Sequence, residues 1–241
     1  MNPRLLFVAA AASVITLAGI AQGQIITGET ATASSNLPGP PQFNFDRVAT
    51  HAVDDSGLTA GDNLASTPDQ MHVKAPDGFM WLSSGDTFGG TDFDPTFTID
   101  LGGLYSVTGV RVFNYNENVP AGNRPDLVNR GIQQTNVLIS SNGVNYTSLT
   151  STTPLTIPIA PGNDTYTGTF FNLVALTGAP VIARFFQLDI LSNYGGDNNF
   201  YGLSELQFDG VLVPEPTTAS FLVLSGLALM ARRQRGVAPR V

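Results

Sequence analysis

The sequence contains no cysteine and only two histidines, His51 and His72. Without cysteine there can be no disulfide framework, thiolate zinc site, iron–sulfur cluster or cysteine nucleophile. Two histidines also exclude a three-histidine metal site. Charged residues are scarce as well, at 12% of 241 residues, against ~25% in typical soluble domains. Because long solvated helices need Glu, Lys and Arg, a helical bundle or coiled coil is disfavoured.

Basic residues are scarcer than acidic residues. Residues 24–213 contain six Lys and Arg against eighteen Asp and Glu. A body this acidic repels phosphate backbones, so we expect no nucleic-acid partner. The chain is also rich in turn-forming residues, with 25 Gly and 16 Pro, yet its apolar fraction of 42% excludes simple disorder. Its length suits one domain of sandwich or barrel type, or at most two small domains.

The N-terminus has the pattern of a secretory signal. Arg4 precedes the apolar stretch from Leu5 to Ile20. Ala21 and Gly23 then supply the small residues at the −3 and −1 positions of a cleavage site before Gln24. The stretch is shorter than the ~20 residues of a membrane span. We therefore expect residues 1–23 to be a signal peptide, the alternative being an N-terminal membrane anchor.

A second apolar run, residues 217–231, lies between Pro214-Glu215-Pro216 and the basic cluster Arg232-Arg233-Gln234-Arg235. As a helix it would be ~22 Å long, short of the ~30 Å hydrocarbon core. This order of motif, apolar run and basic cluster resembles the PEP-CTERM sorting signal of Gram-negative bacteria. The resemblance implies processing by an exosortase-type protease, transient membrane anchoring through the helix, and a cell-surface or extracellular destination. An ordinary C-terminal anchor is the alternative.

The body between these ends, residues 24–210, reads as one all-β domain, joined to the sorting signal (217–241) by a linker at 211–216. Alternating apolar and polar positions predict strands separated by Gly-rich and Asn-rich turns; the strands are expected at 96–101, 107–113, 136–140, 184–191 and 203–208. Gly102-Gly103 is expected to form a turn. In the last strand, Glu205 and Gln207 are expected to face outward, and Trp81 to lie in the core. Several short strands indicate an antiparallel β-sandwich.

The order of several segments resembles a discoidin-type domain, the C-terminal domain type of coagulation factors V and VIII. The segments that carry the resemblance are Ala52-Val53-Asp54-Asp55-Ser56-Gly57-Leu58, Met80-Trp81-Leu82-Ser83, Arg130-Gly131-Ile132, Val137 to Gly143, Ala183 to Leu188 and Gly202 to Phe208. The resemblance implies a galactose-binding-like jelly-roll β-sandwich. Two departures concern the first loop: Asp55 stands where the family usually has glycine, and residues 59–78 form a long insertion.

The resemblance also implies a structural Ca²⁺ near the first Asp turn. Carried over to this chain, Asp54 would supply a carboxylate, Ala52 and Ser56 backbone carbonyls, and Glu205 a ligand from the last strand. These are the oxygen ligands that Ca²⁺ prefers. The alternative is an Asx turn without metal.

Two polar loops are the candidate ligand sites, because planar amides, carboxylates and guanidinium groups suit sugar hydroxyls and aromatic faces suit the ring. Their candidate residues are Asn114, Tyr115, Asn116, Glu117 and Arg130 for the first loop, and Tyr194, Asn198, Asn199 and Tyr201 for the second. Such Asn and Gly clusters also form turns without any ligand.

Three functions remain open at this stage. The first is an exported, surface-targeted, non-catalytic module that binds extracellular polysaccharide or a surface glycan in a matrix or biofilm. The second is a structural surface protein that binds other proteins or itself. The third is an exported glycoside hydrolase, although no Gly-x-Ser-x-Gly or His-Glu-x-x-His motif is present and no carboxylate pair stands out. We expect a protein that is not an enzyme.

Overall fold

The computed structural model describes residues 23–37, 46–59, 65–75, 79–86, 91–118, 125–150 and 153–214. Three expected segments lie outside the described residues: residues 1–22 of the signal peptide, the apolar run and the basic cluster. Within the described residues, no helix is long and apolar enough to cross a membrane.

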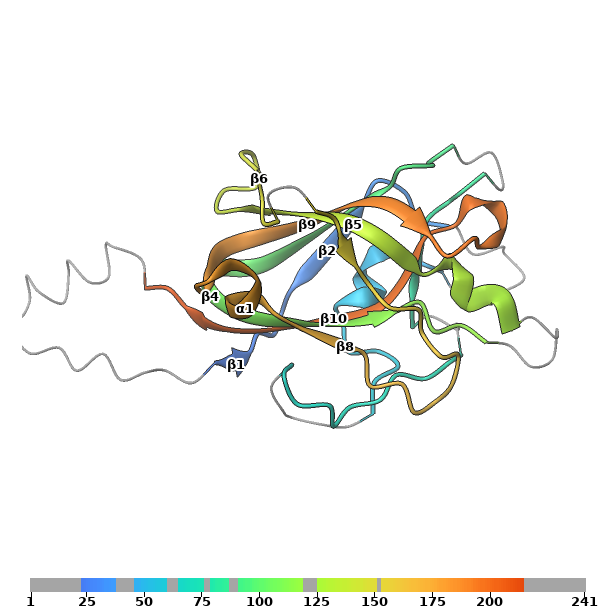
Figure 1. The fold of residues 1–241 in the computed structure, drawn as a ribbon, viewed down its shortest axis with the longest axis horizontal. Coiled ribbons are helices and arrows are strands. Elements are labelled where there is room, and N and C mark those ends of the chain that lie inside the picture. The colour runs from blue at the N-terminus through green and yellow to red at the C-terminus, as the bar shows by residue number, and fades with distance from the viewer. Residues whose placement is uncertain are drawn as a thin grey trace, which may run out of the picture.

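The described residues form an all-β structure, which confirms the predicted fold class (Figure 1). Its elements in chain order are β1 (Gln24–Ile25), β2 (Thr30–Ala33), η1 (Ala49–Ala52), β3 (Trp81–Leu82), β4 (Thr96–Asn114), η3 (Pro125–Arg130), β5 (Ile132–Ser140), β6 (Thr147–Ser148), β7 (Leu155–Thr156), β8 (Thr169–Asn172), α1 (Leu173–Thr177), β9 (Val181–Asn193), η4 (Asp197–Asn199) and β10 (Gly202–Leu212). Every strand pairing between these elements is antiparallel.

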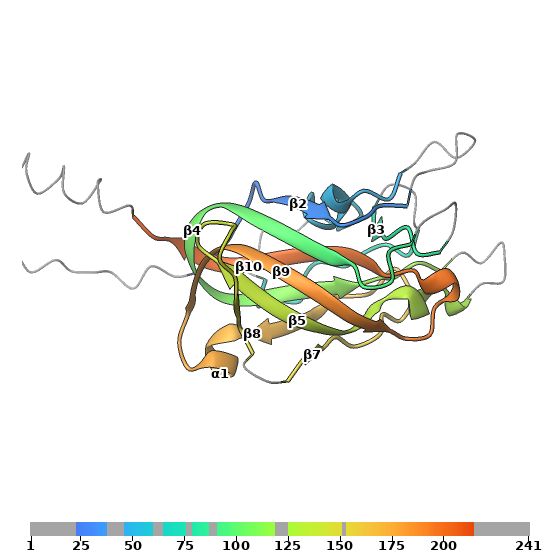
Figure 2. The same ribbon diagram turned by 90° about the horizontal axis from the view of Figure 1, so that it is seen from above.

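The long strand β4 belongs to both layers of the sandwich (Figure 2). Its first part pairs with β2 and β9, and its second part pairs with β8 and β10. The predicted turn at Gly102-Gly103 is wrong, because the strand continues through it with a register shift between Asp100 and Tyr105. Gly102 has a φ of 76°, a conformation that glycine adopts without steric strain. The two glycines thus bend one strand instead of separating two.

The core fills the space between the layers with residues from alternating strand positions. Trp81 is fully buried and its ring centroid lies 4.8 Å from that of Phe97, as the sequence predicts for a core tryptophan. Phe186 of β9 and Phe208 of β10 contact each other across the layers, with centroids 5.0 Å apart. Pairs of this kind add to the free energy gained by burying apolar area.

The outer face of β10 is also buried, so the expectation that Glu205 and Gln207 face solvent is wrong. Residues 65–75, part of the long insertion, pack over this face. The Nε2 atom of Gln207 donates to Oε1 of Gln70 at 2.6 Å, and Asp209 accepts from the backbone N–H of Ser66 at 2.9 Å. Gln207 and Asp209 therefore satisfy side-chain and backbone groups of the insertion instead of meeting water.

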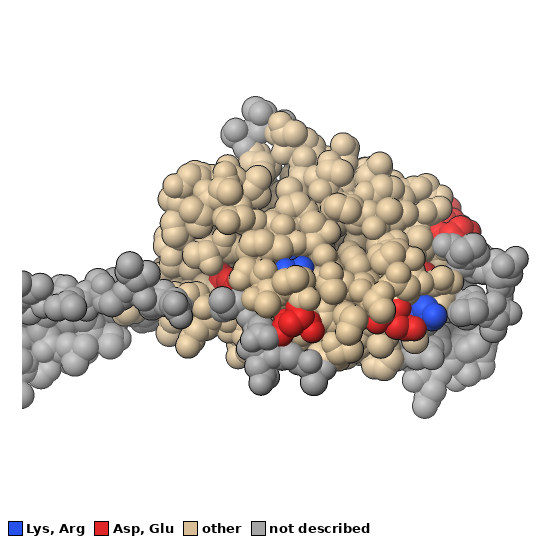
Figure 3. Space-filling view, turned by 60° about the horizontal axis from the view of Figure 1, so that its bottom comes forward, with Lys and Arg blue, Asp and Glu red and all other residues tan. Residues whose placement is uncertain are grey.

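The described chain ends lie together at one end of the sandwich. Gln24 of β1 pairs with Gly210 of β10, and Figure 1 shows β1 and the end of β10 at the left, with η3 and η4 at the right. Charged side chains are sparse on the face shown in Figure 3, where most of the described surface is uncharged.

Candidate functional site

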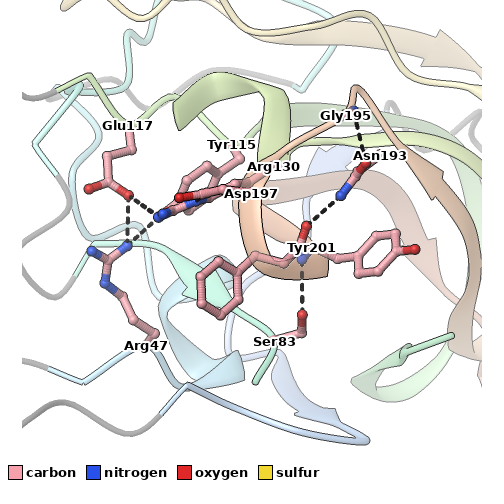
Figure 4. Close-up of polar contacts among 10 residues, drawn as sticks. Arg47, Ser83, Tyr115, Glu117, Arg130, Asn193, Gly195, Asp197 and Tyr201 are labelled. Atoms are coloured by element: carbon pink, nitrogen blue, oxygen red, sulfur yellow. Dashed lines mark hydrogen bonds and ion pairs between the residues drawn. The ribbon is translucent and has the colours of Figure 1, made fainter. Parts of the chain in front are cut away.

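A cluster of paired charges lies at the end of the sandwich formed by η3, η4 and the chain that follows β4 (Figure 4). Glu117 Oε2 lies 3.3 Å from Nη1 of Arg47 and 3.5 Å from Nη1 of Arg130. The same oxygen accepts the Tyr115 hydroxyl, which in turn accepts from Arg47. Arg130 Nε donates to Oδ1 of Asp197 at 2.7 Å. One buried carboxylate thereby joins segments of the chain up to 70 residues apart.

The side chains of Arg47, Glu117 and Arg130 are almost wholly buried. This burial and the paired charges set the protonation states of the cluster. Burial raises the pKa of the Tyr115 hydroxyl above its usual value, so this phenol stays neutral. Burial lowers the pKa of Arg130, but its hydrogen bond to Asp197 and the charge of Glu117 outweigh that effect, and the net shift is upward. Both arginines of the cluster therefore remain charged at any physiological pH.

The second polar loop packs closely against Arg130. A Cβ atom on Gly196 would lie 2.7 Å from the Arg130 backbone nitrogen, so only glycine fits at this position. The guanidinium carbon of Arg130 lies 4.8 Å from the ring centroid of Phe200, in the geometry of a cation–π contact. Asn193 closes the loop by donating to the Phe200 carbonyl at 2.8 Å and accepting from Gly195 N–H at 2.9 Å. The loop is therefore preformed.

Three residues of the first candidate loop are fully buried and serve internal contacts. Asn114 donates to the carbonyls of Ile132 and Pro158, and Asn116 donates to the carbonyl of Asn163 at 2.8 Å. Tyr115 lies inside the charge cluster. Of this loop, Glu117 and Arg130 lie nearest to the surface, with side chains 6% and 11% exposed.

The second candidate loop is more open. Asn198 and Asn199 are exposed and adopt φ values of 53° and 51°, in the left-handed region. Asn199 Nδ2 donates to Oδ2 of Asp86 at 3.0 Å. Tyr194 is half-buried and Tyr201 is buried, and their hydroxyls donate to the carbonyls of Ile157 and Phe93.

Three members of this site, Arg47, Asp86 and Asp197, are not among the residues predicted from the sequence. Nothing near Arg47 in the sequence signals its role, because its partner Glu117 is 70 residues away. Asp197 lies within the predicted polar loop, and its acidic side chain in that loop was the only signal in the sequence.

The predicted Ca²⁺ residues lie around the turn that follows η1. Asp54 Oδ1 accepts from Ser56 N–H at 2.9 Å, which is an Asx turn, and Asp54 Oδ2 lies 3.2 Å from Nδ1 of His51. Ala52 ends η1 and is fully buried. Asp55 has a φ of 58°, in the left-handed region that glycine adopts without strain.

Glu205 approaches this turn from β10. It is the one predicted Ca²⁺ residue with a strongly shifted pKa. It is fully buried, and burial raises its pKa well above the usual value, with the charges of Asp55, Asp54 and Glu29 adding to the shift. Its Oε1 accepts from Leu206 N–H at 3.2 Å, whereas Oε2 has no hydrogen-bond partner among the described residues. A buried oxygen without a partner beside further carboxylates fits a cation. No group of three or more His, Cys, Asp or Glu close enough to hold a metal by themselves occurs in the described ranges, so backbone carbonyls would have to complete the shell.

Glu29 is a further carboxyl near this turn that the sequence did not reveal. Burial raises its pKa from 4.5 to about 7, and the charge of Asp55 adds to that shift.

Because the folded-state pKa of Glu29 exceeds the unfolded value, its contribution to stability is fully present below pH 4.5 and is lost as the pH rises through 7. We expect Glu29→Gln to stabilise the metal-free protein by about 1–2 kcal/mol at pH 8, after allowance for partial exposure, and to have little effect at pH 4. Urea unfolding at both pH values measures this difference. An equal effect at the two pH values would contradict it.

Comparison with known proteins gives structural matches only. No protein family model matches the chain, and no curated protein matches it. A solved family 32 carbohydrate-binding module of NanJ from C. perfringens, in complex with galactose, is 16% identical with a TM-score of 0.46, over 78% of this chain and 98% of that one. A pectin-binding carbohydrate-binding module is 15% identical with a TM-score of 0.42, over 77% and 91%.

A family 89 glycoside hydrolase from Clostridium perfringens also matches, at 21% identity and a TM-score of 0.40. The match covers 80% of this chain but only 16% of the hydrolase, so this chain corresponds to a small part of that enzyme. The likeness to all three concerns the fold, and the ligands named are those of the other proteins.

Proposed function

We propose that this protein is an exported, non-catalytic carbohydrate-binding module that holds an extracellular polysaccharide or surface glycan at its η3–η4 end. The observation that carries the proposal is the pair of exposed amides of Asn198 and Asn199, held in a fixed backbone conformation beside the Arg130–Asp197 ion pair. Sugar hydroxyls are recognised by planar donors and acceptors of this type, and a preformed loop binds without an ordering penalty.

A hydrolytic function is less well supported by the same geometry. A glycosidase needs an accessible carboxylic acid with a raised pKa. Glu205 has such a pKa but is fully buried, and Glu117 at the loop end is tied to two arginines.

The test uses variants that remove an amide without straining the backbone. Asn198→Gly and Asn199→Gly keep the left-handed conformation, since glycine adopts positive φ freely. Each is expected to weaken binding roughly five- to tenfold, the effect of about one hydrogen bond to the sugar. Affinity electrophoresis in gels containing galactan, chitin oligosaccharides or pectin measures the effect.

Asn145→Ala is the matched control, because Asn145 is an exposed amide in the turn before β6. It should bind like the parent protein. Absence of any retardation by all polysaccharides, with and without Ca²⁺, would reject the proposal in favour of a structural surface protein. Equal retardation of the parent and both glycine variants would reject the assigned site.

The proposal includes a structural Ca²⁺ at the Asp54 turn, held by the carboxylates of Asp54 and Glu205 and the carbonyls of Ala52 and Ser56. The partnerless Glu205 oxygen supports it. The ion would tie the start of the domain to its last strand and would take no part in chemistry.

The proposal also includes export by residues 1–23 and surface sorting by residues 214–241. The signal-like N-terminus, the Pro214-Glu215-Pro216 motif and the basic cluster support it. An exosortase-type protease and, before processing, the membrane are then the partners of the C-terminal segment.

A further inference from the structure

Four described segments that meet at one end of the sandwich contain no charged residue. Gln24 of the first segment pairs with Gly210 of the last, and Tyr105 pairs with Leu212 on one side and with Ala183 on the other. These segments, called the uncharged end below, lie opposite η3 and η4 (Figure 1). They are residues 23–28, 102–108, 173–183 and 210–214, and none of them contains Asp, Glu, Lys or Arg.

Three large apolar side chains of the uncharged end are open to solvent. Leu176 is 50% exposed, Ile182 is 52% exposed and Leu212 is 57% exposed. Ile182 and Leu212 are held on either side of β4, where they pair with Ser106 and Tyr105. Leu176 belongs to α1, which leads into β9 and contacts it. Exposed aliphatic side chains without charged neighbours are typical of an interaction surface.

The charged residues that border the uncharged end are paired or buried. Arg184 donates from Nε and Nη2 to the two carboxylate oxygens of Asp100, each at 2.8 Å. Asp209 accepts from the Ser66 N–H at 2.9 Å, and burial raises the pKa of Glu29 to about 7. The border therefore adds little net charge to this end.

Both apolar runs of the sequence adjoin the uncharged end. The run from Leu5 to Ile20 stops three residues before Gly23, and the run 217–231 begins three residues after Pro214. Three residues of extended chain reach at most about 11 Å. A run of either kind that enters a lipid bilayer therefore keeps this end of the sandwich at the bilayer surface.

Charge also selects this end for an approach to lipid. Residues 24–213 contain eighteen acidic and six basic residues, so anionic headgroups repel the body of the protein. The uncharged end is exempt from that repulsion. Its exposed leucines and isoleucine gain free energy when they leave water for the interfacial region of a bilayer.

We propose that the uncharged end rests directly on the surface of a lipid bilayer, with Leu176, Ile182 and Leu212 among the headgroups. The proposal rests on the membrane anchoring included in the proposed function. It goes beyond anchoring because it assigns a contact surface on the folded domain, which fixes the orientation of the sandwich relative to the bilayer.

The test uses the full-length chain with labelled Leu and Ile methyl groups, in nanodiscs of phosphatidylethanolamine and phosphatidylglycerol that carry a nitroxide at the headgroup. Contact should broaden the NMR signals of Leu176, Ile182 and Leu212. Leu191 is the internal control, because it is 46% exposed and lies toward the other end of β9, about 30 Å from Ile182. Its signal should stay sharp.

Ile182→Glu combined with Leu212→Glu places two carboxylates on the contact surface. This double variant should reduce the broadening of Leu176 by about half or more, because anionic lipid repels each added charge. Leu191→Glu is the matched control variant and should leave the broadening of Leu176 unchanged. Equal broadening of Ile182 and Leu191, or broadening of Leu176 that the double variant does not reduce, would overturn the proposal.

The remaining outcomes separate this proposal from the anchoring on which it rests. A chain that does not enter the nanodiscs contradicts both, whereas an anchored chain with sharp Leu176, Ile182 and Leu212 signals overturns the direct contact alone. Nuclear Overhauser contacts of these methyl groups with residues 217–231, or with a second copy of the chain, would identify a different occupant of the surface and would also overturn it.

Discussion

Glu117→Ala is expected to lower the free energy of unfolding by about 3–5 kcal/mol, the loss typical when one partner of a buried ion pair is removed. The variant leaves Arg47 without the carboxylate that it meets at 3.3 Å and deprives Arg130 of one of its two. It also removes the acceptor of the buried Tyr115 hydroxyl. Urea denaturation of the parent and the variant measures the difference.

Two controls show whether the effect comes from the buried charge. Glu117→Gln keeps the shape and an acceptor oxygen, so its loss should lie between those of the parent and the alanine variant. Asp164→Ala removes an exposed carboxylate that lies 3.3 Å from Lys74 and should change stability by no more than ~1 kcal/mol. A loss from Glu117→Ala no larger than that of Asp164→Ala would show that the cluster contributes nothing to the fold.

Addition of Ca²⁺ to the metal-free protein is the second large expected effect. At a concentration one hundred times the dissociation constant, binding adds about 2.7 kcal/mol to the free energy of unfolding. For a domain of this size that raises the thermal midpoint by roughly 5–10 °C. Differential scanning calorimetry with and without Ca²⁺ measures the shift.

Glu205→Gln should abolish this shift, because an amide in place of the buried carboxylate cannot supply the charge that Ca²⁺ requires. The metal-free variant should itself be folded, since burial already disfavours the ionised form of Glu205. Asp164→Asn, at an exposed carboxylate paired with Lys74, should keep the full shift. A shift of equal size in the Glu205 variant would place any bound Ca²⁺ elsewhere.

The strands could be predicted from the sequence because alternation reports directly on which side of a strand is buried. Phe186, Leu188 and Ile190 of β9 face the core as their spacing predicts. The turn expected at Gly102-Gly103 failed because two glycines permit a bend as readily as a reversal, and only the partners of β4 decide between them. Likewise, the outward assignment of Gln207 failed because the insertion that covers it carries no periodic signal. That of Glu205 failed because its neighbours Asp54 and Asp55 come from a turn about 150 residues earlier in the chain.

The sequence could predict which segments carry the polar side chains of the candidate site. It could not predict which contacts those side chains make. The polar composition around Asn114 and Asn198 marked two segments that the structure brings together, because Arg130 of the first meets Asp197 of the second. The sequence could not show that Asn114 and Asn116 face inward, because their acceptors, such as the Ile132 carbonyl, come from other segments. Arg47 could not be predicted for the same reason, because its partner Glu117 lies 70 residues away in the sequence.

The pairing of Gln24 in β1 with Gly210 in β10, at the opposite end of the sandwich from η4, has a consequence for any tethered form of the protein. An attachment at either terminus would leave the amide-bearing loops turned toward the surrounding medium, separated from the support by the length of the sandwich. Attachment and ligand capture would then not compete for space, and neighbouring copies on one support could contact the same polymer strand.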